Sequence, residues 1–191
     1  MGGLVAFEMA QQLRQQDHTV NLLVLLDSPA LLANKQVLDA STIMHLFIQE
    51  LEGLFLRRIP LSLTDLQQIE EERQLNYLLE QAGKANALPP DIEQSQLRRL
   101  FTTFRMNLQA LLKYTPNPYA GRLTILNARH EQSIEHEQAI NAWTTLTKDV
   151  RVYNIPGTHY TLVREPVVQA VAKTLKLCLE EAQAITTSKG S

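Results

Sequence analysis

Three short apolar runs that lack any alternation of apolar and polar residues constrain the fold of this chain most strongly. The first, TVNLLVLLDSPA, closes at Asp27-Ser28-Pro29, and the other two are RLTILNA (122–128) and DVRVYNIPG (149–157). An unbroken apolar run is typical of a strand that is buried on both faces, as in a parallel sheet covered by helices. Helical patterns at about 132–147 and 166–184 separate and follow the last two runs. This alternation predicts an α/β fold.

A long helical stretch lies between the first and second runs, from about residue 36 to 114. Within it, Ser62-x-x-Asp65 resembles a capping box, and Gly53 is predicted to end the first helix. An insertion of this size is more than a connection between two strands, and we interpret it as a lid. Because no linker or internal repeat divides the 191 residues, we expect one domain, residues 1–191, with a helical lid at about 36–114.

The chain opens with MGGLVAFEMAQQL, which places two glycines in the first turn of an apolar helix. Glycine there costs helix stability unless the backbone turns sharply or closely approaches another group. The apolar pattern predicts one buried side that is made of Leu4, Val5, Phe7, Met9, Ala10 and Leu13. The polar residues Gln11, Arg14 and Gln15 are predicted to lie outside.

Composition excludes several classes of partner and site. The net charge is -2 with a pI near 6.2, and no run of five or more Lys and Arg occurs, so we expect neither nucleic acid nor an anionic membrane as a partner. The longest aliphatic run, 22–26, is far too short to span a membrane, and no signal-peptide pattern is present, so the expected compartment is the cytoplasm. The single cysteine, Cys178, lies in an apolar helical pattern and is predicted to be a buried core residue.

Two polar residues follow predicted strands at positions that suit catalysis. Asp27 ends the first run, and His159 follows the third in the stretch IPGTHYTLVREP. Both are expected at the carboxyl ends of parallel strands, where ligand crevices of open α/β sheets lie. A carboxylate and an imidazole are two of the three groups needed for nucleophilic catalysis by an acid–base–nucleophile triad.

The order of these motifs resembles that of the thioesterase domains of nonribosomal peptide and polyketide synthases, which are α/β-hydrolases. Their nucleophile region typically reads G-x-S-x-G-G-x-x-A-x-E-x-A, and MGGLVAFEMA matches its last part. The family's strand ending in an acid is matched by LLVLLDSPA, its Y-x-P-x-P-Y-x-G segment by YTPNPYAGRLTIL, and its histidine loop by PGTHYTLVREP. The resemblance covers almost the entire chain and implies a partial α/β-hydrolase fold, with C-terminal parallel strands, flanking helices and a helical lid.

The resemblance also implies roles for individual residues. Asp27 would be the triad acid, His159 the general base, and the backbone amide of Met1 the first oxyanion-hole donor. The substrate would be an acyl or peptidyl chain on the phosphopantetheine thiol of a carrier protein, released by hydrolysis or cyclisation without a bound cofactor. No metal site is implied.

The chain departs from the family pattern at its start, because the nucleophilic serine would stand immediately ahead of Met1. Ser28 does not replace it, since it lies in a turn before Pro29 without surrounding glycines. The 191 residues are therefore expected to be inactive as a thioesterase by themselves. In the family's strand order, the strand that leads into the serine would lie beside the first strand of this chain. Without it, the first strand would have an unpaired edge, through which the chain could self-associate.

Alternatives remain open at this point. Other α/β-hydrolases, including editing thioesterases, place the acid after the next strand, where Glu131 stands; we prefer Asp27, which favours the product-releasing type. His130 and His136 with Glu131, Glu135 and Glu137 are interpreted as a solvated charged surface rather than a metal site. Alternative functions are a non-catalytic fragment that binds an acyl chain or a protein, and a carboxylesterase or lipase of the same fold.

Overall fold

The computed structural model of this chain describes residues 1–30, 37–89, 91–129 and 134–189. It divides into two compact units. The first consists of Met1–Ala33 together with Tyr114–Ser191, and the second is Asn34–Lys113. The second unit covers nearly the same residues as the predicted helical insertion, and each unit is described by itself below.

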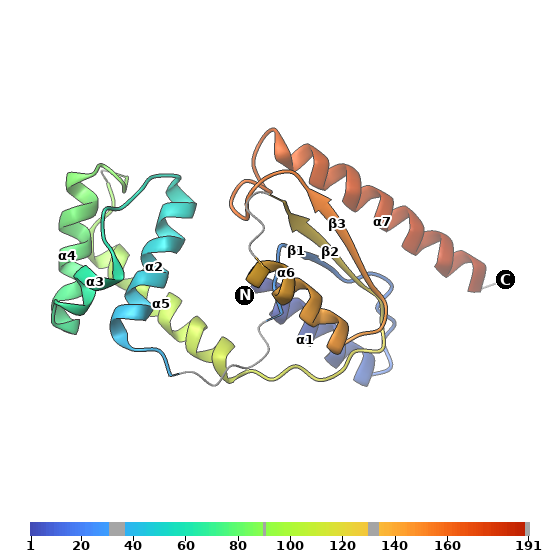
Figure 1. The fold of residues 1–191 in the computed structure, drawn as a ribbon. Coiled ribbons are helices and arrows are strands. Elements are labelled where there is room, and N and C mark those ends of the chain that lie inside the picture. The colour runs from blue at the N-terminus through green and yellow to red at the C-terminus, as the bar shows by residue number, and fades with distance from the viewer. Residues whose placement is uncertain (31–36, 90, 130–133, 190–191) are drawn as a thin grey trace. The chain divides into compact units, whose positions relative to one another are not determined.

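The first unit is built on a parallel sheet of three strands, β1 (Val24–Leu26), β2 (Leu123–Ala128) and β3 (Val150–Ile155), in the order β1-β2-β3 (Figure 1). Leu25 of β1 pairs with Ile125 of β2, which in turn pairs with Val152 of β3. All six residues of the central strand β2 are buried, because strands flank it on both sides and helices cover it. The predicted α/β fold with parallel strands is confirmed.

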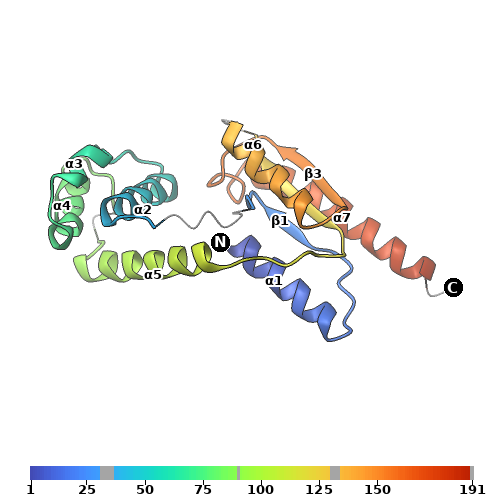
Figure 2. The ribbon, with the colours of Figure 1, turned by 60° about the horizontal axis from the view of Figure 1, so that its bottom comes forward.

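Four helical elements flank this sheet: α1 (Gly2–Gln15), α6 (Ile134–Asn141), the 3-10 helix η1 (Ala142–Thr145) and α7 (Val167–Lys189). Figures 1 and 2 show α1 and α6 on one face of the sheet and α7 on the other. On the first face, the rings of Phe7 and Trp143 pack with centroids 4.8 Å apart, and neither side chain is exposed. On the second face, Cys178 of α7 is buried, as predicted.

Helix α1 buries only part of its apolar surface. The buried residues recur every three or four positions and form one stripe, Leu4, Phe7, Ala10 and Gln11. The prediction that Gln11 lies outside is wrong: its Nε2 donates a hydrogen bond to the carbonyl oxygen of Asn117, at 2.8 Å, which satisfies the amide in its buried position.

Three apolar residues of α1 that were predicted to be buried are exposed, namely Val5, Met9 and Leu13. They are spaced four residues apart and therefore lie on one side of the helix. The apolar surface of α1 is wider than the stripe that packs against the rest of its unit, so an apolar pattern alone assigned too many residues to the core. We call these three residues the α1 stripe.

In its described residues, the second unit has helices as its only regular elements: α2 (Ala40–Phe55), α3 (Leu63–Gln67), α4 (Glu71–Lys84) and α5 (Gln94–Lys113). Its core is made of apolar side chains from these helices and the connections between them, including Met44, Phe47, Leu66, Leu78 and Leu97. The predicted capping box is confirmed, since the Ser62 side chain accepts from the amide N–H of Asp65 while the Asp65 carboxylate accepts from that of Ser62.

The prediction that Gly53 ends the first helix of this unit is wrong. Helix α2 continues to Phe55, and Leu56 takes the left-handed conformation that caps it, with φ of 53°. The extra turn brings Phe55 against the apolar core of the unit. The Glu52 carboxylate accepts from the amide N–H of Ile59 at 2.7 Å, which ties the following segment to the helix end. Among the described residues, no helix combines the length and the hydropathy that crossing a membrane requires.

Candidate active site at the carboxyl ends of the strands

Asp27 stands directly after β1 and has a left-handed backbone, with φ of 42°. Asp tolerates this conformation better than most residues with a side chain. Its amide N–H still donates to the carbonyl oxygen of Leu126, at 2.8 Å, so the ladder to β2 extends through this residue. Its carboxylate Oδ1 accepts from the amide N–H of Ala128 at 2.9 Å. The end of β2 thus fixes both the backbone and the side chain of Asp27.

His159 lies in the loop that follows β3, and that loop is held by its own contacts. The amide N–H of Thr158 donates to Oγ1 of Thr161 at 2.8 Å. Leu162 is buried in a cluster with Leu126 and Ile155 of the sheet. Gly157 has φ of 136°, a conformation that disfavours any side chain. The loop is therefore anchored on both sides of His159.

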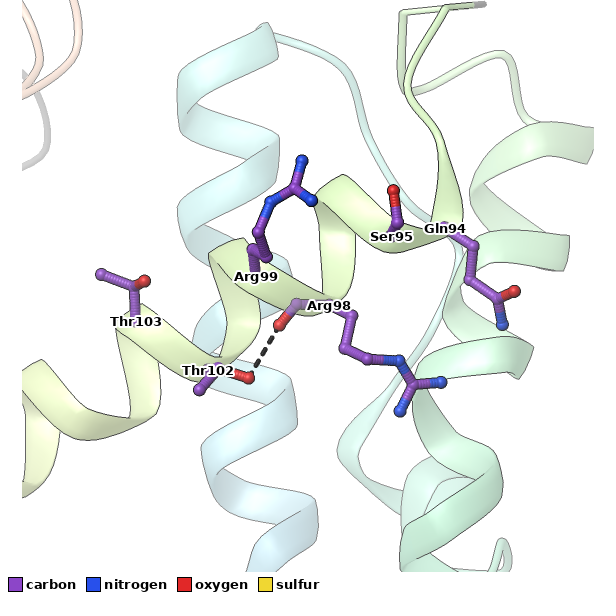
Figure 3. Close-up of a pocket in the computed structure, with 6 residues that line it drawn as sticks. All are labelled: Gln94, Ser95, Arg98, Arg99, Thr102 and Thr103. Atoms are coloured by element: carbon purple, nitrogen blue, oxygen red, sulfur yellow. Dashed lines mark hydrogen bonds between the residues drawn. The ribbon is translucent and has the colours of Figure 1, made fainter.

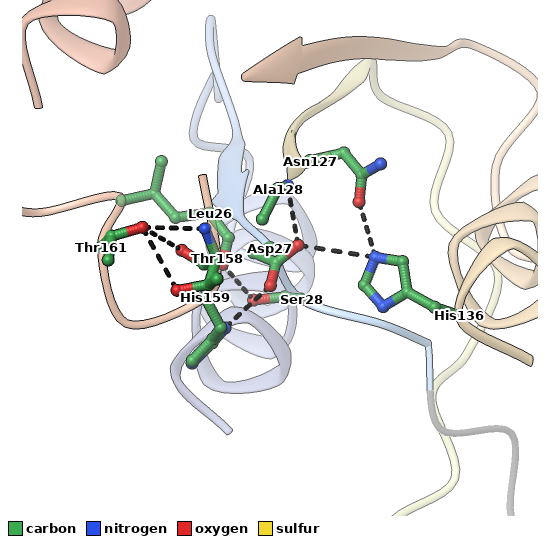
Figure 4. A network of polar contacts seen from close by, with 9 residues as sticks. All are labelled: Leu26, Asp27, Ser28, Asn127, Ala128, His136, Thr158, His159 and Thr161. Carbon is green, nitrogen blue, oxygen red and sulfur yellow. Dashed lines mark hydrogen bonds and ion pairs between the residues drawn. The ribbon is translucent and has the colours of Figure 1, made fainter. Parts of the chain in front are cut away.

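The two predicted site residues meet in the structure (Figure 4). Nδ1 of His159 lies 2.9 Å from Oδ2 of Asp27, although the residues are 132 positions apart in the sequence. The Asp27 side chain is 6% exposed and that of His159 56%, so a buried carboxylate holds a half-exposed imidazole. A carboxylate accepts here, so Nδ1 is the donor and Nε2 is the nitrogen that carries the basic lone pair.

The surroundings of Asp27 favour its charged form. Burial alone would raise the pKa of this carboxyl, but the hydrogen bonds from His159 and from the Ala128 amide, together with the nearby imidazoles of His136 and His159, outweigh it. The net effect holds the pKa of Asp27 below its ordinary value. The carboxylate is thus able to stabilise positive charge on the His159 ring.

His136 is also part of this site, which corrects its interpretation as part of a solvated surface. Its Nε2 lies 2.8 Å from Oδ1 of Asn127 and 3.5 Å from Oδ1 of Asp27. Helix α6 carries His136 to the ends of the strands, and its side chain is only 25% exposed. The sequence signal that could have found it is its position in the helix that follows β2, because such a helix begins at the same sheet edge as Asp27.

The other residues of the predicted charged surface give little further information. His130 and Glu131, including the rival acid position, lie outside the described residues, as does the side chain of Glu135. Within the described part of the chain, no group of three or more His, Cys, Asp and Glu side chains could hold a metal ion.

The opening glycines have different environments. A Cβ atom on Gly3 would overlap the side chain of Ser28, whereas one on Gly2 would meet no atom within 4 Å. The close approach that the glycine pair predicted is therefore at Gly3. The first turn of α1 thus lies against Ser28, the residue that follows Asp27. The indole Nε1 of Trp143 also donates to the carbonyl oxygen of Ser28, at 2.7 Å. Met1 begins this turn and its carbonyl accepts from the Leu4 amide at 3.0 Å; its oxyanion role stays a prediction.

The helical unit has a pocket of about 560 Å³ on α5 (Figure 3). It is lined by polar side chains of α5 alone, Gln94, Ser95, Arg98, Arg99, Thr102 and Thr103. Figure 3 shows the side chains of Arg98 and Arg99 extending away from each other rather than toward a common point. Two diverging guanidinium groups do not form a bidentate anion site, so the Asp27–His159 pair remains the candidate site.

A helix-flanked parallel sheet with a carboxylate–imidazole pair at the carboxyl ends of its strands is typical of hydrolases of the α/β type. Within this class of hydrolases, the sequence matches one family. The chain belongs to the thioesterase domain family, whose model matches residues 1–177.

Solved structures agree with this family. The chain is similar to the four-domain nonribosomal peptide synthetase AB3403 in its holo form bound to AMP and glycine, with 27% identity and a TM-score of 0.79 over 92% of this chain and 14% of that one. It is also similar in fold to the Vlm2 thioesterase domain bound with a dodecadepsipeptide (20% identity, TM-score 0.62, 91% of this chain and 61% of that one). The NocB thioesterase domain from the nocardicin cluster gives 21% identity and a TM-score of 0.55 over 94% of this chain and 61% of that one.

The chain therefore spans less than two thirds of the thioesterase domains that it resembles. No curated protein sequence matches it significantly.

Proposed function

We propose that this chain supplies the acid and the base of a Ser-His-Asp triad in a thioesterase that releases an acyl or peptidyl chain from a carrier protein. The observation that carries the proposal is the 2.9 Å contact between Oδ2 of Asp27 and Nδ1 of His159 at the carboxyl ends of the strands. Membership of the thioesterase domain family supports a thioester as the substrate class. The similarity to a nonribosomal peptide synthetase supports a chain that arrives on a phosphopantetheine arm. The reaction needs no bound cofactor.

The nucleophile of this proposal is a serine hydroxyl, which the family motif places at the position immediately ahead of Met1. In the first step, Nε2 of His159 takes the hydroxyl proton while the serine oxygen attacks the thioester carbonyl. The negative oxygen of the tetrahedral intermediate accepts from backbone N–H groups, for which we propose the peptide N–H at Met1 as one donor. The C–S bond then breaks, and His159 returns the proton to the departing thiol.

The second step releases the product from the serine ester. Water, or a nucleophilic group on the bound chain itself, attacks the ester carbonyl while His159 takes its proton. The ester C–O bond breaks, the serine oxygen regains the proton from His159, and the product leaves as an acid or a macrocycle. In both steps Asp27 holds the ring by Nδ1 and stabilises the imidazolium.

The test uses a chain in which a segment with the family's nucleophile strand and Gly-x-Ser stands ahead of Met1. Turnover is measured on an acyl thioester of a carrier protein and on a matched oxoester. We expect His159→Ala to lower thioester turnover by about three orders of magnitude or more, as removal of one triad member does. His18→Ala changes an exposed histidine in the connection after α1; it is the matched control and is expected to keep full turnover.

Full thioester turnover in His159→Ala would refute the assignment. If turnover depends on His159 but is faster on the oxoester than on the thioester, the triad assignment would stand. The function would then be that of a carboxylesterase of the same fold instead of a thioesterase.

A further inference from the structure

Side-chain hydrogen bonds connect His136, which lies beside Asp27, to Asn127 of β2 and Asn154 of β3. Nδ2 of Asn127 donates to Oδ1 of Asn154 at 3.1 Å, which turns the amide oxygen of Asn127 toward His136. That oxygen lies 2.8 Å from Nε2 of His136. An amide oxygen only accepts, so Nε2 of His136 must carry a hydrogen. The network thus selects one protonation site on the His136 ring.

The same Nε2 of His136 lies 3.5 Å from Oδ1 of Asp27 (Figure 4). At this separation the N–H is too distant for a good hydrogen bond to the carboxylate, but its positive end is close enough to act on the charge. The two carboxylate oxygens therefore have separate surroundings. Oδ1 faces the Ala128 amide and His136, whereas Oδ2 faces His159.

We propose that His136 is a positioning residue for the triad acid: its Nε2–H, set by Asn127, holds Oδ1 of Asp27 so that Oδ2 points at His159. The inference rests on the proposed function, in which Asp27 orients His159. The groups that act on Asp27 come from three elements, the amide at the end of β2, the ring of His136 on α6 and the ring of His159 in the loop after β3. Rotation of the carboxylate away from His159 would weaken all three interactions.

The protonation pattern is tested first, on the 191-residue chain with ¹⁵N-labelled histidine. Long-range ¹H–¹⁵N spectra at pH 8 distinguish the two neutral forms of each ring. We expect His136 to carry its hydrogen on Nε2 and His159 on Nδ1. Asn127→Leu is expected to remove the preference at His136. Observation of the Nδ1–H form of His136, or a His136 ring insensitive to Asn127→Leu, would overturn the proposal.

The kinetic test uses the serine-bearing chain and the carrier-bound thioester. His136→Leu removes the donor and is expected to lower kcat about tenfold with an unchanged KM, which corresponds to the loss of one interaction with a charged group. His136→Gln keeps an N–H in reach of Asn127 and is expected to restore most of kcat. Gln138→Leu, at an exposed position of the same helix, is the control for the change in apolarity and is expected to behave as the unmodified chain.

The outcomes separate this proposal from the one on which it rests. Full turnover in His159→Ala would refute the triad itself. An inactive His159→Ala together with wild-type kcat in His136→Leu would refute only the role of His136. Should His136→Leu not fold, the ring spectra of the unmodified chain and the kcat of His136→Gln still decide the question. Absence of the Nε2–H form of His136 in the unmodified chain, or a large loss of kcat in His136→Gln, would each reject the role of His136.

Discussion

At the scale of single residues, Asp27 combines an unusual backbone with a charge that its neighbours stabilise. Its φ of 42° is acceptable to Asp, Asn and Gly and costs most other residues free energy. Its carboxylate is buried, yet its pKa is held below the ordinary value by the interactions that oppose burial. Both the left-handed backbone and the surroundings that stabilise a negative charge therefore favour Asp at position 27.

The lowered pKa of Asp27 predicts how acid acts on stability. Above the ordinary pKa of about 3.9, the carboxylate is charged in both the folded and the unfolded chain, and its contacts stabilise the fold. As pH falls through the lower pKa of the folded state, that contribution is lost. We therefore expect Asp27→Asn to reduce the free energy of unfolding by about 1–3 kcal/mol at pH 7. The difference from the unmodified chain is expected to shrink as the pH falls below the ordinary pKa of the carboxyl.

Urea unfolding at a series of pH values measures this difference. Asp17→Asn is the matched control, because Asp17 also has a left-handed backbone, with φ of 62°, and is exposed. We expect the control to change the free energy of unfolding by less than about 0.5 kcal/mol. An Asp27→Asn protein as stable as the unmodified chain at pH 7 would contradict the stabilising role of the carboxylate.

At the scale of elements, the contact between α1 and the end of β1 depends on one glycine. Gly3 lies against Ser28, and the space for a Cβ atom is taken by that side chain, whereas the neighbouring Gly2 has open space. The first turn of α1 can approach the residue after Asp27 only because residue 3 has no side chain.

The glycine pair therefore predicts opposite effects for two identical substitutions. Gly3→Ala is expected to reduce the free energy of unfolding by about 1–3 kcal/mol through overpacking against Ser28. Gly2→Ala is expected to be neutral or to increase it by about 0.4–1 kcal/mol, because alanine restricts the unfolded chain. Thermal or urea unfolding of the two variants measures both effects, and equal destabilisation would show that the contact with Ser28 does not limit residue 3.

The strands, and the meeting of Asp27 and His159 at their carboxyl ends, could be predicted from the sequence because the signals are local. An unbroken apolar run identifies a buried strand, and the residue that ends it must lie at the carboxyl edge of the sheet. Helix ends were predicted less accurately from the sequence. Gly53 does not end α2, because the contact of Phe55 with the core outweighs the preference of glycine for a helix end. The contacts of His136 with Asn127 and Asp27 could not be predicted, because they depend on how the three side chains are oriented in three dimensions.

At the scale of the whole molecule, the incomplete burial of α1 leaves an apolar surface that a partner could contact. The α1 stripe, Val5, Met9 and Leu13, places apolar side chains on the surface at helical spacing. Within the described residues, the neighbouring strand β1 pairs with β2 only, so its other edge presents backbone donors and acceptors. An exposed apolar stripe and an unpaired strand edge each favour association between copies of the chain.

We expect the chain to self-associate and Met9→Lys to weaken this association about tenfold or more, since burial of one methionine side chain contributes about 1.5–3 kcal/mol. Sedimentation velocity over a range of concentrations measures the effect. Gln15→Lys adds the same charge at an exposed polar position of α1 and is expected to leave the association unchanged. A chain that sediments as a monomer at every concentration would contradict the prediction.

The buried indole beside the site has a practical consequence for work on this protein. Trp143 is the only tryptophan of the chain; it packs on Phe7 and donates to the backbone carbonyl of Ser28, one residue beyond Asp27. Its fluorescence emission is therefore a built-in optical probe of the sheet-containing unit, whereas far-ultraviolet circular dichroism samples the helices of both units. Melting curves recorded by the two signals would distinguish unfolding of the sheet-containing unit from unfolding of the helical unit without any added label.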